Sequence, residues 1–166
     1  MTGVQTCALP ICFDRSRGEA VTIDAGTVIA ERAEAWSPLV EEREVKLATV
    51  LDRGLAVLAT AGALEQILDN LLANAVEVAP AGSTITVTCA EAGTTVRLCV
   101  TDEGPGMTPD QRARAFDRFW RAETHGSGSG LGLSIVHRLV TADGGTISLG
   151  NAPSGGLAVE IRLRRA

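Results

Sequence analysis

A strand that runs into an acidic, glycine-rich turn decides how this chain folds: Leu98-Cys99-Val100-Thr101-Asp102-Glu103-Gly104-Pro105-Gly106-Met107. The run from Ser83 to Ala90 alternates apolar and polar residues in the same way, and Ala92-Gly93 is a short turn between the two runs. The pattern predicts a hairpin. With Ala92 and Gly93 as its loop, the expected pairs are Ile85 with Val100, Val87 with Leu98 and Cys89 with Val96, all on the buried face.

Asp102 should share that buried face, because it lies two positions beyond Val100 and side chains alternate across a strand. A lone buried carboxylate is costly, so we expect a polar partner for it. Gly104 and Gly106 remove side chains just beyond the carboxylate, which leaves room for a flat ligand against bare backbone. The stretch alone is compatible both with a base-binding pocket and with an ordinary solvated turn.

The composition predicts one soluble globular domain. The chain has 166 residues, 45% of them hydrophobic and 21% charged, and a formal net charge of -5, which argues against binding to nucleic acid. No apolar run approaches the roughly 18 to 20 residues that span a bilayer, so the chain alone is not expected to be a membrane protein. The four cysteines include no CxxC pair, and Cys89 and Cys99 should point to opposite faces of the hairpin. We therefore expect reduced thiols in a cytosolic setting and no cysteine metal site.

Residues 1–11 match no periodicity of the rest of the chain and closely resemble the translation of a sequencing-adapter oligonucleotide. We expect this stretch to be an assembly artefact, which would make the native protein longer; a disordered native N-terminus is the alternative. Residues 12–20 fit the remnant of a linker, and residues 21–166 fit the folded domain.

The remaining elements follow from periodicity. Strands are expected over 21–23, 45–50, 55–59, 145–149 and 156–163, and helices over 25–42, 64–78, 109–120 and after Gly132. Asp24 should cap the first helix, and Pro38 should bend it or end it early.

The helix over 64–78 carries a second, polar stripe beside its apolar one. Asn70, Asn74 and Glu77 lie at positions i, i+4 and i+7, so they line up on one side of the helix. Asn is a poor helix former, and two of them one turn apart have no evident structural benefit. Amide oxygens suit Mg²⁺, which also keeps its waters and substrate phosphates. The alternative is the ordinary wet face of an amphipathic helix.

Two further stretches leave alternatives open. Phe116, Phe119 and Trp120, interleaved with Arg118 and Arg121, could form a local core, a docking surface or the base of a mobile lid. The glycine-rich run 126–133 precedes a helix and so predicts an anion site, although a flexible linker has the same composition. It matches neither the P-loop nor the dinucleotide pattern. His125 and His137 are not expected to be catalytic.

The order of four motifs resembles the N, G1, F and G2 boxes of the catalytic, ATP-binding domain of sensor histidine kinases. These motifs are Asp69-Asn70-Leu71-Leu72-Ala73-Asn74-Ala75, Asp102-x-Gly104-x-Gly106, Phe116-Asp117-Arg118-Phe119 and Gly128-x-Gly130-x-Gly132. That family belongs to the ATPase superfamily shared with gyrase, Hsp90 and MutL. The resemblance covers roughly residues 21–164. It implies an α/β two-layer sandwich, with a mixed β-sheet, helices on one face and an ATP lid between the F and G2 boxes.

The resemblance also implies a role for each matched residue. Asn74 would hold Mg²⁺ at the ATP phosphates with Asn70 beside it, and Asp102 would accept the adenine amino group. The other implied ATP-binding residues are Gly104 and Gly106 at the base, Gly128, Gly130, Leu131, Gly132 and Leu133 at the lid, and Arg118 or Arg121 at the phosphates. Phe116 and Phe119 would face a helical phosphoacceptor domain.

Two departures from the family pattern qualify these roles. Glu77 stands where the family usually carries a basic or aromatic residue, commonly Lys, so we expect modest nucleotide affinity. The phosphoacceptor His segment is absent, so the chain should bind Mg-ATP and phosphorylate a supplied acceptor domain without autophosphorylation, and it contains no catalytic residue of its own. The implied parent is a membrane-anchored homodimer that acts on a response regulator, with this cytoplasmic domain itself monomeric. A stand-alone serine kinase of the anti-sigma-factor type and a non-catalytic nucleotide-binding module are the alternatives.

Overall fold

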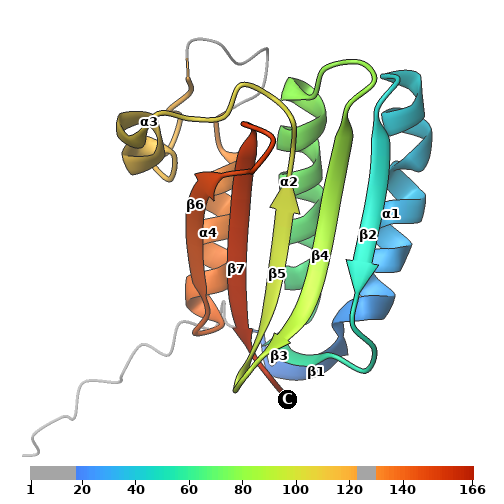
Figure 1. Ribbon diagram of the computed structural model, residues 1–166. Coiled ribbons are helices and arrows are strands. Elements are labelled where there is room, and N and C mark those ends of the chain that lie inside the picture. Colours follow the sequence, from blue (N-terminus) through green and yellow to red (C-terminus); the bar gives the residue numbers. More distant parts are fainter. Residues whose placement is uncertain (1–17, 123–129) are drawn as a thin grey trace, which may run out of the picture.

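The computed structural model describes residues 18–122 and 130–166 (Figure 1). A five-stranded mixed sheet carries α1, α2 and α4 on one face, as Figure 1 shows, so the predicted two-layer α/β sandwich is confirmed. The strands are β1 (Ala20–Asp24), β2 (Lys46–Leu51), β3 (Ala56–Thr60), β4 (Thr84–Ala92), β5 (Thr95–Thr101), β6 (Thr146–Asn151) and β7 (Leu157–Arg164). The helices are α1 (Ala25–Glu42), α2 (Ala63–Val78), α3 (Pro109–Arg114) and α4 (Gly132–Ala142). The expectations for residues 1–17, for His125 and for Gly128 lie outside the described residues.

The five strands follow the order β2-β4-β5-β7-β6. β2 runs parallel to β4, and the other neighbours are antiparallel. β1 and β3 form a separate two-stranded antiparallel sheet, so the two strands that flank the turn at 52–54 belong to different sheets. The end of the chain joins the sheets, because Arg165 bridges to Val57 and the Ala166 amide donates to the Ala56 carbonyl at 2.9 Å.

The β4–β5 hairpin forms as predicted, but its expected register is wrong by two residues. Val100 pairs with Val87 instead of Ile85, and Ala92 pairs with Thr95, so the loop is Gly93-Thr94. Gly93 has φ 67°, and glycine in the first loop position is what a type II′ hairpin turn requires. A shift of two keeps every side chain on its face. All six residues expected on the inner face are buried: Ile85, Val87, Cys89, Val96, Leu98 and Val100.

The core lies between this sheet face and the helices. The predicted apolar stripe of α2 is buried throughout: Leu64, Ile67, Leu68, Leu71, Leu72 and Ala75. Cys89 and Cys99 are both free thiols, as expected, and Cys89 is buried within the core. Burial raises the pKa of the Cys89 thiol to about 11, so it stays protonated at neutral pH.

Helix α1 begins where its cap predicts and continues past its proline. The Asp24 side chain accepts a hydrogen bond from the Thr27 amide at 2.9 Å. Pro38 lies inside the helix, so the expectation that it ends α1 early is wrong. Pro38 and Glu34, the residue whose carbonyl loses its helical partner, are both exposed, and water can satisfy that carbonyl. None of the helices in residues 18–122 and 130–166 combines the length and apolar character needed to cross a bilayer.

Helix α3 is shorter than predicted. It ends at Arg114 and leaves the three aromatic residues in the turns that follow. Phe119 has φ 64°, a left-handed conformation that a helix cannot contain. The start of α3 is fixed by a capping box between Thr108 and Gln111.

Candidate functional site

A cavity of about 230 Å³ lies where α2, the turn that follows β5 (residues 102–107, the β5 turn), α4 and the segment 109–122 (the α3 segment) meet. The motifs that were far apart in the sequence line it together. The lining residues predicted as site residues are Asn70, Asn74, Asp102, Gly106, Arg121, Gly130, Gly132 and Leu133. Gly104, Leu131, Arg118, Phe116 and Phe119 do not line the cavity.

Asp102 lies at the end of β5 and faces inward as predicted. Its side chain is 5% exposed. The expected polar partners include two backbone amides, because Oδ1 accepts hydrogen bonds from Gly104 at 2.8 Å and from Leu157 at 3.2 Å. The Asp102 amide in turn donates to the Leu157 carbonyl at 3.1 Å. These bonds stabilise a carboxylate at the cavity wall that would otherwise be costly to bury.

Glycines surround Asp102 because the backbone is too close for a side chain. A Cβ on Gly104 would lie 2.9 Å from Val78 Cγ2, and one on Gly106 would lie 2.7 Å from the Gly155 carbonyl. Gly156, which was not predicted as a site residue, is closer still: a Cβ there would lie 2.0 Å from the Asp102 carbonyl oxygen. The adjacent pair Gly155-Gly156 in the closing hairpin was the available signal, since paired glycines often mark a close backbone approach.

Asn70 and Asn74 project from α2 toward the start of α4. The side-chain Nδ2 of Asn70 donates to the Gln66 carbonyl at 2.8 Å. A Cβ on Gly132 would lie 3.1 Å from both amide atoms of Asn74 and 3.5 Å from Asn70 Oδ1. The two side chains therefore offer hard, neutral amide oxygens beside the N-terminus of α4. This set suits a Mg²⁺ ion that shares its ligands with phosphates.

Glu77 and Arg121 form an ion pair across the cavity mouth. The distance from Glu77 Oε1 to Arg121 Nη2 is 3.7 Å, and the side chains are 28% and 34% exposed. The sequence singled out both residues but did not predict their contact. Arg118 instead lies over the Phe119 ring, 5.5 Å from its centroid, so Arg121 is the one of the two arginines that reaches the cavity.

The aromatic residues of the α3 segment divide into two kinds. Phe116 stacks on His137 of α4, with ring centroids 4.8 Å apart, and packs against the core. Trp120 lines the cavity, a position that the aromatic cluster in the sequence did not predict. Phe119 is 67% exposed. The segment thus combines packing residues with one projecting ring. The local-core interpretation fits Phe116 and Trp120, and the docking-surface and lid interpretations stay predictions.

Comparison with known proteins agrees with this geometry. The model of the family described as histidine kinase-, DNA gyrase B-, and HSP90-like ATPase matches residues 59–166. The chain belongs to this ATPase family. Its relatives place this ATPase domain in the sensor histidine kinase group, so the resemblance noted in the sequence is confirmed.

One relative is the sensor protein IrlS of Burkholderia pseudomallei, 36% identical over 137 residues that cover 80% of this chain and 29% of the relative. The mycobacterial sensor histidine kinase MprB is a structural neighbour with TM-score 0.78 and 28% identity, covering 88% of this chain and 97% of that one. Full-length ShkA in complex with AMPPNP has TM-score 0.80 and 33% identity, covering 90% of this chain and 32% of that one. The chain spans about a third of the length of the curated relatives it matches.

Proposed function

We propose that this ATPase domain is the catalytic part of a sensor histidine kinase, which binds Mg-ATP in the described cavity and donates the γ-phosphoryl group to a His of a helical phosphoacceptor domain. The observation that carries the proposal is the meeting of Asp102, Asn70 and Asn74 at one cavity. The structural neighbour ShkA was solved with AMPPNP, an ATP analogue, which supports a nucleotide as the ligand.

The base would bind at the β5 turn. The Asp102 carboxylate is buried and held in place by amides, so it can accept a hydrogen bond from the adenine amino group. Gly104 and Gly106 keep side chains out of the space beside it. The apolar lining from Met107 and Leu157 suits a flat aromatic ring.

The phosphates would bind between α2 and the start of α4. Asn74, with Asn70 beside it, would hold Mg²⁺, which neutralises phosphate charge when bound. The α4 amides near Gly130, Leu131, Gly132 and Leu133 would face the phosphates, since a helix N-terminus favours anions; Gly128 shares this proposed role. Arg121 would offset the remaining negative charge; Arg118, the other arginine predicted for this role, lies over the Phe119 ring outside the cavity lining. Phosphoryl transfer depends mainly on such positioning and electrostatics.

The acceptor domain would dock on the α3 segment, where Phe119 projects into solvent. We propose Phe116 and Phe119 for this contact, with Phe116 also supporting the segment from within. The parent would be a membrane-anchored homodimer that passes the phosphoryl group to a response regulator, while residues 21–166 alone would be monomeric and cytoplasmic. Residues 1–11 would be foreign to that parent.

Calorimetric titration with Mg-ATP tests the site. We expect Asp102→Ala and Asn74→Ala each to abolish measurable binding, and Asp110→Ala, which changes an exposed acid of α3, to leave it unchanged. Unchanged affinity in both site variants would reject the assignment.

Incubation with γ-labelled ATP and a supplied phosphoacceptor domain tests the reaction. The label should appear on the acceptor as an acid-labile, base-stable phosphohistidine and should not appear on this domain alone. An acid-stable phosphoserine on a partner would favour the anti-sigma-factor type of kinase instead.

A further inference from the structure

The charge at this cavity is unusual for a site that takes a polyanion. Among the described lining residues the charged ones are Asp102, Glu77 and Arg121, two acids and one base. Asp102 is engaged by the amides of Gly104 and Leu157 at the base end. The Glu77–Arg121 pair therefore supplies no net positive charge at the end of the cavity where the phosphates would lie.

Glu77 is close to the proposed metal-binding asparagines. It follows Asn74 by three positions on α2, and residues three apart are neighbours on a helix surface. Its carboxylate adds a hard, charged oxygen beside the neutral amide oxygens of Asn70 and Asn74. All three residues line the cavity.

The ion pair of Glu77 is easily exchanged. At 3.7 Å, between side chains that are about a third exposed, it is a weak interaction. Arg binds phosphate through two parallel hydrogen bonds, which are stronger. When Arg121 turns to a phosphate group, the Glu77 carboxylate loses this guanidinium and faces the negative charge of the triphosphate.

We propose that Glu77 makes triphosphate binding depend on a divalent cation more steeply than a neutral side chain at this position would. The proposal rests on the proposed function. Metal-free ATP brings four negative charges toward the carboxylate, whereas its complex with a divalent cation brings two fewer and offers the carboxylate a positive partner. Glu77 thereby acts as a specificity-determining residue that favours the metal complex over the free nucleotide.

The experiment compares affinities for ATP in excess Mg²⁺ and in excess EDTA, at constant ionic strength, for the wild-type chain and for Glu77→Gln. The measured quantity is the dissociation constant for ATP in excess EDTA divided by the dissociation constant in excess Mg²⁺. We expect this ratio to be about tenfold smaller in Glu77→Gln, because metal-free ATP binds the neutral variant more tightly. Glu77→Lys, tested in the same way, should reduce the ratio further.

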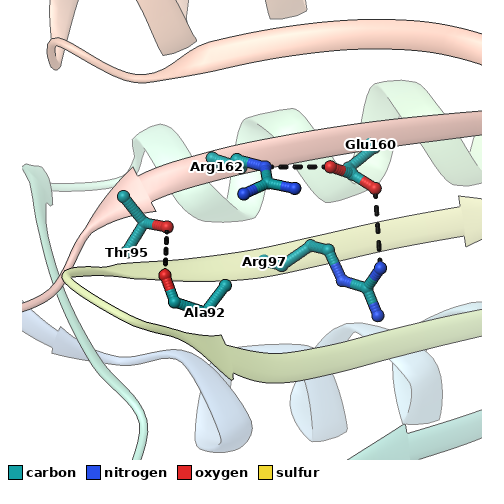
Figure 2. Close-up of polar contacts among 5 residues, drawn as sticks. All are labelled: Ala92, Thr95, Arg97, Glu160 and Arg162. Carbon is teal, nitrogen blue, oxygen red and sulfur yellow. Dashed lines mark hydrogen bonds and ion pairs between the residues drawn. The ribbon is translucent and has the colours of Figure 1, made fainter.

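A matched control comes from the opposite face of the sheet. Glu160 follows the cavity-lining Val159 on β7, and its carboxylate lies between Arg97 at 3.7 Å and Arg162 at 2.9 Å (Figure 2). Glu160→Gln removes the same charge from the chain without touching the cavity, so its ratio should equal that of the wild type. Equal ratios in Glu77→Gln and the wild type, or an equal fall in Glu160→Gln, would overturn the proposal.

Adenosine separates this outcome from a failure of the proposed function. Adenosine carries no phosphate, so its affinity should be the same in the wild type and in Glu77→Gln, which also shows that the variant is folded. A wild-type chain that binds neither adenosine nor Mg-ATP would overturn the proposed function and this inference together.

Discussion

The β5 turn and the α3 segment form two walls of one cavity but are held in different ways. The β5 turn is fixed by backbone, with glycines packed so closely that a Cβ would meet other atoms at 3.0 Å or less. The α3 segment is held by side chains: a Phe116–His137 stack, the Glu77–Arg121 pair and hydrogen bonds from Arg112. We infer that the β5 turn takes its final shape when the domain folds, whereas the α3 segment can move by rearranging side chains while the rest of the domain stays folded.

The largest effect expected from this comparison comes from adding one methyl group at Gly156, which packs directly against Asp102 of the β5 turn. Gly156→Ala would place a Cβ 2.0 Å from the Asp102 carbonyl and should lower the free energy of unfolding by at least about 3 kcal/mol in urea denaturation. Gly150→Ala is the control, because no atom lies within 4 Å of its Cβ position. Equal stability of both variants would contradict the tight packing described here.

A second test compares the two phenylalanines of the α3 segment. Phe116→Ala should cost roughly 2 kcal/mol of stability, less than a fully buried ring, because Phe116 is partly buried and stacks on His137. Phe119→Ala should leave stability unchanged within about 0.5 kcal/mol, since its ring is 67% exposed. Thermal or urea unfolding checks both. A larger loss for Phe119→Ala would reverse the division between packing and projecting rings.

A third test adds a methyl group at the start of α4, where Gly132 faces the asparagines of α2. Gly132→Ala would bring a Cβ 3.1 Å from the Asn74 amide atoms, so affinity for Mg-ATP should fall roughly tenfold, about 1.4 kcal/mol. Stability should not fall, because Ala is favoured over Gly in a helix. Adenosine affinity, measured by the same calorimetry, should not change. Loss of stability here would show that the Asn74 side chain cannot move to make room for the added methyl group.

The smallest effect is expected at Arg112, which links the α3 segment to the β5 turn and to the end of β6. Arg112 donates to the Met107 carbonyl at 2.8 Å and to Asn151 Oδ1 at 3.0 Å, and Arg112→Ala should cost about 1 kcal/mol in the same denaturation assay. Arg114→Ala is the control, because that side chain is 66% exposed. If Arg114→Ala proved the more costly of the two, the Arg112 contacts would not be what fixes the α3 segment.

The sequence was most informative where local pattern and burial agree. The start of α1 and the N-cap at Asp24 follow from local signals alone. The inward position of Asp102 also followed, although the predicted hairpin register was wrong by two residues, because a shift of two leaves each side chain on its face. The roles of Asn70, Asn74 and Asp102 stay predictions until binding is measured.

The remaining features depend on contacts that no local pattern encodes. The end of α3 at Arg114 and the left-handed Phe119 beyond it were not predicted. The continuation of α1 through Pro38, on a side that faces solvent, was not predicted either. The Glu77–Arg121 pair joins residues 44 positions apart, and the crowding at Gly156 joins two loops. The Glu77–Arg121 contact and the crowding at Gly156 are set by tertiary packing, which periodicity and composition do not record.

Asp143, at the end of α4, accepts hydrogen bonds from the Thr60 amide at 3.1 Å and the Thr60 hydroxyl at 2.7 Å. The other end of α4 rests against Asn74 through Gly132. The two ends of α4, roughly 16 Å apart, are thus each in contact with a different part of the domain. Because α4 connects these two contacts, we expect a displacement of the small β1–β3 sheet to move the start of α4 beside Asn74 as well.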